Sequence, residues 1–302
     1  MARSATVEVN VGNRKLRLSN LDKVMYPKTG FTKGQVVDYY TRVSKALLPH
    51  LKDRPLTLKR YPNGVDDKFF YEKQSPSHRP DWVKTVPVPA RGRTIDFTLC
   101  NNLPTLVWLA NLADIELHTS LSKATDIQRP TTLAFDLDPG PGTTIVECSQ
   151  VAFWLREIFQ ELGLESFPKT SGSKGMQIYV PLNTKTTYDE TKPFSKALAE
   201  LLAKQHPELV VSTQKKELRK NKVLIDWSQN DEHKTTVSVY SLRAKERPTV
   251  STPITWDEVG HILDSGDPEE GVFDSDDVLA RVEEHGDLFE PVLKLRQKLP
   301  KL

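Results

Sequence analysis

The segment TTLAFDLDPGPG, residues 131–142, constrains the fold more than any other part of this chain. In a β-strand, side chains two residues apart share one face. Asp136 and Asp138 would then point to one face, and the other face would carry Leu133, Phe135 and Leu137. Two neighbouring carboxylates repel each other and raise each other's pKa unless a cation lies between them. The pattern therefore favours either a metal-binding strand or a solvated edge strand.

The residues after this strand alternate between helical and strand patterns. Thr144 and Glu147 fit a capping box before an apolar stripe with helical spacing, which ends at Gly163. A second helix carries Phe194, Leu198, Leu201 and Leu202, and strands are expected over 166–170, 176–182, 209–213 and 223–227. Short strands that alternate with two long helices predict an α/β fold, an α+β sandwich in which helices cover one face of a sheet.

The regions on either side have their own patterns. Residues 31–55 read as a helix, because apolar side chains from Val36 to Leu51 recur at helical spacing. The segment PLTLKRYPNGVDDKFFYEKQ then predicts two strands around an Asn-Gly turn. After Pro253 the chain reads as an acidic, helical tail.

Charge is distributed unevenly along the chain, although the formal net charge is only +2. Residues 1–130 contain 21 Lys and Arg against 12 Asp and Glu, residues 131–250 contain 16 against 15, and residues 251–302 contain 5 against 13. We interpret these ranges as a basic portion, a metal-site portion and an acidic tail of one catalytic domain over 1–302. The basic portion favours a polyanionic partner such as nucleic acid, although a solvated face can have the same composition.

The composition is typical of a cytoplasmic protein. A chain of 302 residues with 37% hydrophobic content can bury a sizeable core. Cys100 and Cys148 supply neither a disulfide framework nor a zinc cluster, which favours a reducing compartment. No apolar run approaches the ~18 residues of a membrane span, and the first ten residues lack a signal-peptide core, so no membrane partner is expected.

The loop SGSKG, residues 171–175, suits phosphate binding. Its glycines let backbone N–H groups turn inward, and Ser171, Ser173 and Lys174 add donors and charge. The Walker A spacing is absent, and the Ser-x-x-Lys match to penicillin-binding enzymes lacks their Ser-Asp-Asn element. A plain β-hairpin turn is the alternative.

Asp226 ends the apolar run KVLID. Because burying an unpaired carboxylate is costly, Asp226 should either join Asp136 and Asp138 around a divalent cation or pair with Lys222 or Arg219. Mg²⁺ and Mn²⁺ prefer carboxylate oxygens and substrate phosphates. Two such ions can stabilise both the attacking and the leaving oxygen in phosphoryl transfer.

Seven short motifs follow one another along the chain: Lys-Arg-x-Pro-Asn-Gly, Phe-Tyr-Glu-Lys-Gln, Glu-Leu-His, Phe-Asp-Leu-Asp-Pro-Gly, Ser-Gly-Ser-Lys-Gly, Asp-Trp-Ser-Gln-Asn and Tyr-Ser-Leu-Arg. Each alone has an ordinary structural explanation, such as a surface histidine or a core aromatic pair. Together they closely resemble the polymerase domain of bacterial ligase D, the end-joining branch of the archaeo-eukaryotic primase superfamily. The resemblance covers nearly the whole chain. It implies a primase-type α/β sandwich with a catalytic module like an RNA-recognition motif.

The resemblance also implies roles for individual residues. It matches the catalytic carboxylates, which hold two Mn²⁺ or Mg²⁺ ions, to Asp136, Asp138 and Asp226. It matches the residues around the incoming nucleotide to Lys59, His118, Ser171, Ser173, Lys174, Arg219, Gln229 and Arg243. It matches an aromatic pair that stacks near the template to Phe70 and Tyr71, and a pocket for a DNA 5′-phosphate to Asn20, Lys23 and Lys33.

One departure from the family pattern stands out, while a second, Tyr71 in place of the family's Phe, keeps an aromatic ring that stacks comparably. The family usually has a histidine two residues after the glycine-rich loop, where this chain has Gln177. Glutamine can donate a hydrogen bond to a phosphate but adds no charge, so a lower nucleotide affinity or rate is expected.

The resemblance implies a nucleotidyltransferase that extends 3′-hydroxyl ends at DNA breaks or gaps under the direction of a template, with ribonucleotides and Mn²⁺ preferred. The implied partners are DNA carrying a 5′-phosphate, NTPs or dNTPs, a Ku-like protein, and a DNA ligase domain or chain. Ligation is not expected here, because the chain has no Lys-x-Asp-Gly adenylation motif.

Three alternatives stay open. One is a primase that starts chains without a primer, and another is a non-catalytic scaffold that binds DNA ends. The third is an Asp-x-Asp glycosyltransferase, which explains Asp136 and Asp138 but neither Asp226 nor the basic portion.

Overall fold

The computed structural model describes residues 6–90 and 92–301, which form two compact units. Each unit is assembled from separate stretches of chain. Unit 1 comprises Met1–Ser120, Val237–Val250 and Asp274–Gly286, and unit 2 comprises Leu121–Thr236, Ser251–Phe273 and Asp287–Leu302. Neither unit coincides with one of the three portions expected from charge, and the single catalytic domain stays a prediction.

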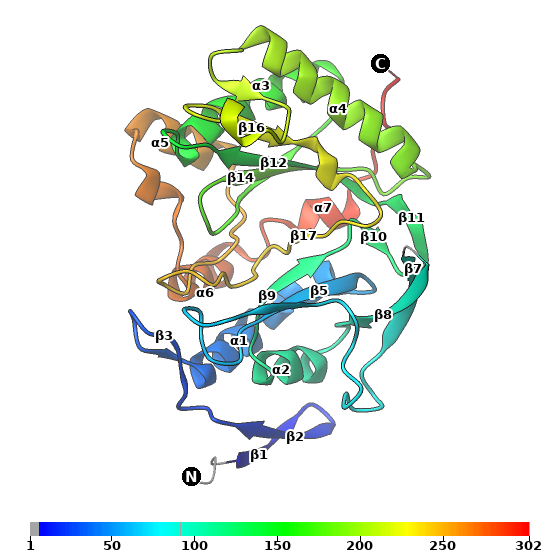
Figure 1. The fold of residues 1–302 in the computed structure, drawn as a ribbon, viewed down its shortest axis with the longest axis vertical. Coiled ribbons are helices and arrows are strands. Elements are labelled where there is room, and N and C mark those ends of the chain that lie inside the picture. The colour runs from blue at the N-terminus through cyan, green and yellow to red at the C-terminus, as the bar shows by residue number, and fades with distance from the viewer. Residues whose placement is uncertain (1–5, 91, 302) are drawn as a thin grey trace. The chain divides into compact units, whose positions relative to one another are not determined.

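Unit 2 contains a five-stranded sheet whose middle strand is the Asp-x-Asp segment. The strand order is β13 (Phe167–Thr170), β14 (Met176–Pro181), β12 (Thr132–Pro139), β16 (Val223–Asp226) and β15 (Val210–Val211). Neighbouring strands are antiparallel except β15 and β16. Because β12 is hydrogen-bonded on both sides, it is not a solvated edge strand (Figure 1).

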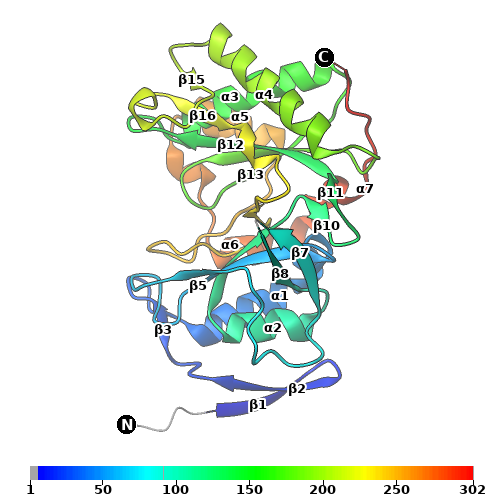
Figure 2. The same cartoon turned by 45° about the vertical axis from the view of Figure 1, so that its right-hand side comes forward.

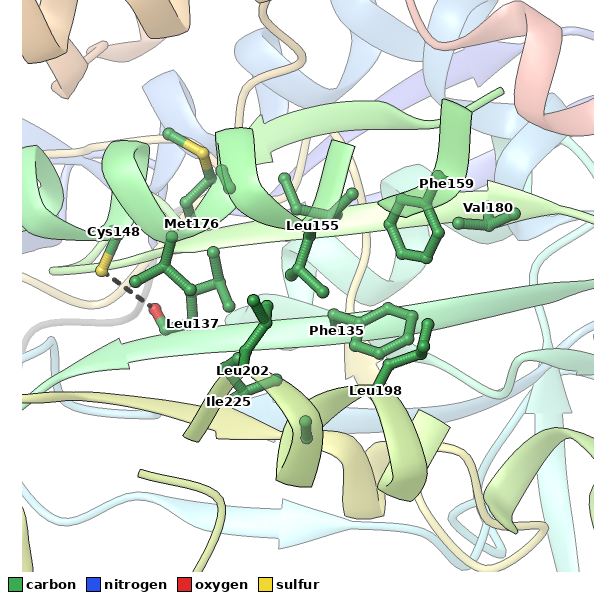
Figure 3. Close-up of a cluster of buried hydrophobic side chains, with 14 of the residues drawn as sticks. Phe135, Leu137, Cys148, Leu155, Phe159, Met176, Val180, Leu198, Leu202 and Ile225 are labelled. Carbon is green, nitrogen blue, oxygen red and sulfur yellow. Dashed lines mark hydrogen bonds between the residues drawn. The ribbon is translucent and has the colours of Figure 1, made fainter. Parts of the chain in front are cut away.

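Two helices cover one face of this sheet, as the apolar pattern predicts. They are α3 (Ile145–Glu161) and α4 (Tyr188–Gln205). Their apolar stripes pack on alternate residues of the strands. Figure 3 shows Phe135 and Leu137 between Leu155 and Phe159 of α3 on one side and Leu198 and Leu202 of α4 on the other. The start of α3 has the expected capping box between Thr144 and Glu147. The apolar face of β12 is thus in the core, and its two aspartates lie on the opposite face.

Shorter elements complete unit 2. They are β10 (Ser122–Lys123), β11 (Asp126–Pro130), α5 (Trp256–Ser265), α7 (Glu290–Lys294) and the 3₁₀ helices η1 (Lys216–Leu218), η2 (Trp227–Gln229) and η3 (Pro268–Gly271). The helices expected after Pro253 are therefore present. Helix α5 packs on α3.

Unit 1 contains a six-stranded sheet with the order β17 (Thr236–Val237), β9 (Asp114–Thr119), β5 (Pro55–Arg60), β8 (Arg93–Leu99) and β7 (Thr85–Ala90). The sixth strand, β6 (Phe70–Glu72), pairs with β5. Figure 2 labels β5, β8 and β7 of this sheet. Two small ribbons precede it, β1 (Thr6–Val11) with β2 (Arg14–Ser19) and β3 (Val24–Tyr26) with β4 (Phe31–Thr32). The helices are α1 (Lys33–Leu51), α2 (Leu103–Asn111) and α6 (Ser275–His285), and α1 packs on the other two.

The two strands expected around the Asn-Gly turn are β5 and β6. They pair antiparallel as predicted, but their connection runs over residues 61–69 instead of a two-residue turn. On β5 and β9 the buried side chains of Leu58 and Leu117 alternate with Lys59, Glu116 and His118, which share the other face. In the part of the chain that is described, no helix is both long and apolar enough to cross a membrane.

Candidate functional site

The three predicted carboxylates come together on one face of the unit 2 sheet. Asp136 on β12 lies directly opposite Asp226 on β16, and Asp138 follows two residues along β12 on the same face. Directly opposite side chains of an antiparallel pair are about 5 Å apart at Cβ. Asp136 and Asp138 are half-buried, and Asp226 is buried.

Each of these carboxylates is held by a neighbouring donor. Gln177 Nε2 donates to Asp136 Oδ1 (3.0 Å), and Arg219 Nη2 lies 3.5 Å from Asp138 Oδ2. Asp226 accepts from the backbone N–H of Ser228 (3.0 Å) and from Nε2 of Gln229 (2.9 Å). Arg219 therefore pairs with Asp138 and not with Asp226.

The donor set fits a hard divalent cation. Burial, together with the charges of Asp138 and Asp226, raises the pKa of Asp136 to about 7, although the hydrogen bond from Gln177 opposes the shift. Excess negative charge of this kind is what a cation would offset. Among the described residues, no group of three or more His, Cys, Asp or Glu side chains is arranged so that it could hold a metal ion. Asp136, Asp138 and Asp226 are nevertheless the oxygen donors that Mg²⁺ and Mn²⁺ prefer.

A buried lysine extends this row and was missed by the sequence analysis. Across the sheet, Lys169 pairs with Gln177, Gln177 with Asp136, and Asp136 with Asp226. Lys169 is fully buried, its Nζ donates to Ser251 Oγ (2.5 Å), and its charge lowers the pKa of Asp136. A lysine inside the strand SFPKT was the only sequence signal, and the strand register reveals its partners.

The loop of residues 171–175, which the sequence predicts to bind phosphate and which is called the phosphate loop below, connects β13 to β14 beside the end of β12. Ser171 Oγ accepts from the backbone N–H groups of Ser173 and Gly175 (3.2 Å each), which closes the loop on itself. Lys174 is exposed at its tip. The loop borders a cavity of about 300 Å³ that is also lined by residues at the start of α3 and in η3.

Unit 1 carries a separate cluster of basic side chains around a buried glutamate. Lys59 Nζ lies 3.4 Å from Glu116 Oε1, His118 Nε2 lies 2.9 Å from Glu116 Oε2, and Arg243 Nε lies 3.5 Å from the same oxygen. The backbone N–H of Ala244 donates to Glu116 Oε1 (3.1 Å). Glu116 is 1% exposed, and only the motif Glu-Leu-His pointed toward it.

The charges in this cluster set the protonation of its members. Burial alone would raise the pKa of Glu116, but the hydrogen bond from His118 and the charges of Arg243 and Lys59 hold it below its usual range. Burial lowers the pKa of His118, and the charges of Arg243 and Lys59 act in the same direction against the effect of Glu116. The glutamate is therefore ionised and the imidazole neutral near pH 7.

Aromatic rings lie next to this cluster. Phe70 and Tyr71 are 44% and 61% exposed, so they do not form the core pair that was the ordinary alternative. Phe69 is also exposed, and Lys59 Nζ lies 4.3 Å from the centre of its ring. Large exposed rings beside a cation are suited to stacking on bases.

The three residues assigned to the 5′-phosphate lie around the start of α1. Lys33 is the first residue of α1 and is buried, and its Nζ donates to the carbonyl of Ser19 (2.6 Å). Lys23 Nζ donates to the carbonyl of Pro62 (2.6 Å), and Asn20 has a left-handed backbone (φ 55°). Burial, with the charges of Lys23 and Arg60, lowers the pKa of Lys33 to about 8. Lys33 is thus not an ordinary solvated lysine.

The candidate residues sort by unit. Unit 2 holds Asp136, Asp138, Ser171, Ser173, Lys174, Arg219, Asp226 and Gln229, and unit 1 holds Asn20, Lys23, Lys33, Lys59, Phe70, Tyr71, His118 and Arg243. Asn230 in the motif Asp-Trp-Ser-Gln-Asn has a structural task, because its amide both donates to and accepts from the backbone of Ala134.

Comparisons with known proteins match the chain as a whole. The family model described as the LigD primase-polymerase domain matches residues 32–289. The multifunctional non-homologous end joining protein LigD of Mycolicibacterium smegmatis is 40% identical over 280 residues, 92% of this chain and 36% of that protein. The bifunctional LigD of Bacillus subtilis is 33% identical over 273 residues, 90% of this chain and 43% of that protein. The chain thus spans well under half the length of these relatives.

A solved structure has a similar fold. The polymerase domain of Mycobacterium tuberculosis ligase D, in complex with DNA, superposes with a TM-score of 0.85 and 38% identity. The match covers 92% of this chain and 98% of that domain. The expected fold class is confirmed, and the chain belongs to the LigD primase-polymerase domain family.

Proposed function

We propose that this chain extends 3′-hydroxyl ends at DNA breaks or gaps by template-directed nucleotidyl transfer and prefers ribonucleotides. The observation that carries the proposal is the pairing of Asp136 with Asp226, with Asp138 beside them, on the face of the sheet opposite α3 and α4, in a chain that matches the LigD primase-polymerase family model. The M. tuberculosis domain of similar fold is a polymerase domain in complex with DNA. End joining is named for the relatives, and we extend it to this chain as the setting of the reaction.

Asp136, Asp138 and Asp226 would hold two divalent ions, Mn²⁺ or Mg²⁺. Bound ions would supply the positive charge that stabilises the attacking and leaving oxygens of the phosphoryl group. The protein's own part is to hold the carboxylates ionised and in place. Gln177 does so by donating to Asp136, and Gln229 by donating to Asp226.

The remaining residues would bind the substrates. In unit 2, the loop of residues 171–175 and Arg219 would offer donors to a triphosphate. In unit 1, Lys59, His118 and Arg243 would offer donors and an acceptor to a nucleotide. Phe70 and Tyr71 would stack near the template. Asn20, Lys23 and Lys33 would hold the 5′-phosphate on the far side of a gap, where the start of α1 already favours an anion. A Ku-like protein and a DNA ligase are the proposed partners.

A primer-extension assay on gapped DNA tests this function. With Mn²⁺ and UTP opposite adenine, the wild type should add a ribonucleotide to a preformed primer. Asp136→Asn or Asp138→Asn should abolish the addition while DNA binding stays near the wild-type value. Products made without any primer would instead indicate a primase, and DNA binding without extension would indicate a scaffold.

A further inference from the structure

The buried carboxylate of Glu116 contacts Lys59, His118 and Arg243. The two carboxylate oxygens have different partners. Oε1 lies near Lys59 and accepts from the N–H of Ala244, and Oε2 lies near His118 and Arg243. Lys59, Glu116 and His118 lie on one face of adjacent strands β5 and β9. One side chain therefore fixes three groups that the proposed function assigns to the nucleotide.

This contact determines which nitrogen of His118 carries the proton. An ionised carboxylate can only accept hydrogen bonds, so His118 Nε2, 2.9 Å from Glu116 Oε2, must be the donor. Two fixed positive charges nearby disfavour a second proton on the ring. A neutral imidazole with its proton on Nε2 presents Nδ1 as an acceptor.

The other two basic side chains in the cluster cannot accept a hydrogen bond from a nucleotide hydroxyl. Lys59 and Arg243 have only donors in their charged side chains. They suit phosphate or carbonyl oxygens, whereas a sugar hydroxyl needs an acceptor to receive its proton. His118 Nδ1 is the acceptor that this cluster offers.

We infer that Glu116 is a positioning residue: it fixes His118 as the tautomer that accepts a hydrogen bond from a nucleotide hydroxyl, and so sets the preference for ribonucleotides. The inference rests on the proposed nucleotidyl transfer. A site built to hydrogen-bond a hydroxyl discriminates against the analogue that lacks it.

The first test reads the tautomer directly in the intact wild-type chain. Nitrogen-15 NMR of the imidazole rings at pH 7.5, with His118 assigned by comparison with His118→Asn, should show a protonated Nε2 and an unprotonated Nδ1. A proton on Nδ1, alone or with Nε2, would overturn the inference. This measurement needs neither DNA nor metal.

The second test separates positioning from general stability. Glu116→Gln should raise the KM for UTP about tenfold, the cost of roughly one hydrogen bond, with kcat changed less than about threefold. The preference for UTP over dTTP should fall toward one, and the tautomer signal should change. Glu116→Asp, which keeps the charge, should recover part of the preference. Glu72→Gln is the matched control: Glu72 is a partly buried carboxylate of the same sheet that pairs with Arg60, and its removal should leave the UTP preference intact.

The two proposals fail in different ways. If the wild type extends no primer with any nucleotide, the proposed function fails whatever the tautomer. If the wild type extends with UTP and Glu116→Gln folds, keeps its ribonucleotide preference and keeps the wild-type ring signal, only the role of Glu116 fails. If Glu116→Gln does not fold, two other results test the role of Glu116. A proton on His118 Nδ1 in the wild type, or a complete loss of the UTP preference in a folded Glu116→Asp, would overturn it.

Discussion

At the scale of single residues, Gln177 is the neutral donor that supports Asp136. Its amide lowers the pKa of Asp136, which burial and two neighbouring carboxylates raise to about 7. Gln177→Ala should therefore leave less of the ionised carboxylate and weaken apparent Mn²⁺ affinity by roughly 10- to 100-fold, the usual cost of losing an outer partner of a metal ligand. Two measurements give the apparent Mn²⁺ affinity: isothermal titration calorimetry with Mn²⁺ in the absence of DNA, and the rate of primer extension at increasing Mn²⁺ concentration.

A second glutamine provides the control for this substitution. Gln128→Ala removes an exposed glutamine that contacts Glu232, away from the three aspartates. It should leave Mn²⁺ affinity unchanged. Equal Mn²⁺ affinity in Gln177→Ala and wild type would rule out this supporting role.

Lys33 should make recognition of the 5′-phosphate depend on pH. Its pKa is lowered to about 8, so the folded protein loses this charge as pH rises through 8, whereas an unfolded lysine stays charged to about 10.5. Below pH 8 the buried charge opposes folding, and stability rises between pH 8 and 10.5 as the unfolded chain holds the extra proton. The binding preference for a 5′-phosphorylated gap should fall between pH 7 and pH 9.

Gapped-DNA binding with and without the downstream phosphate measures this preference at each pH. Lys33→Arg keeps its charge across this range, so any preference that it retains should not change with pH. Lys23→Ala combined with Lys33→Ala should remove the preference while bulk, salt-dependent DNA binding largely remains. A wild-type preference that is constant from pH 7 to pH 9 would contradict the role given to Lys33.

At the scale of elements, the phosphate loop is held in place by a close approach of backbones at Gly175. A Cβ added there would lie 2.0 Å from the carbonyl oxygen of Leu137, so the loop would have to move away from β12. Gly175→Ala should cost about 1–3 kcal/mol of stability, typical of overpacking, and should lower extension at least tenfold. Thermal melting and UTP kinetics on the same preparation measure both effects.

Gly260 in helix α5 offers the matched substitution. A Cβ there would meet Phe153 at 3.7 Å, an ordinary contact, and alanine is favoured over glycine inside a helix by up to about 1 kcal/mol. Gly260→Ala should therefore melt slightly higher and extend normally. Normal extension by Gly175→Ala would show that the loop tolerates displacement.

The elements also show what local patterns could and could not reveal. The capping box before α3, the two-residue alternation of β12 and the helical stripe of α1 depend on neighbours in sequence, and all three are present as expected. The partners of Lys169 and Glu116 are set by strand register and by contacts over long sequence separations, such as that of Glu116 with Arg243. No local sequence pattern encodes such pairs. The sequence therefore revealed the three aspartates but not the buried side chains of Lys169 and Glu116 that contact the candidate residues.

At the scale of the whole molecule, the acidic tail is part of both cores. Val278 of α6 is fully buried in unit 1, where α6 packs on α1. Val259 and Ile262 of α5 are buried in unit 2 beside α3, and Gln297 donates to the carbonyl of Pro181. The sequence predicted an acidic, helical tail of one catalytic domain, and the burial of these side chains shows that its helices belong to the cores of the two units.

A fragment of residues 1–250 should therefore lose stability in both units. It lacks the buried side chains of α5, α6 and α7, and removing even one large buried apolar side chain typically costs 2–5 kcal/mol, a large part of the stability of an ordinary domain. We expect the fragment to lose its cooperative melting transition and its extension activity.

A control variant of the full chain keeps the helices and removes only charge. It carries Asp264→Asn, Glu283→Gln and Glu284→Gln, all at exposed residues. It should melt close to wild type and bind DNA somewhat more tightly at low salt. If the fragment melts and extends like the full chain, the buried helices α5 and α6 do not contribute to the stability of the two cores as expected here.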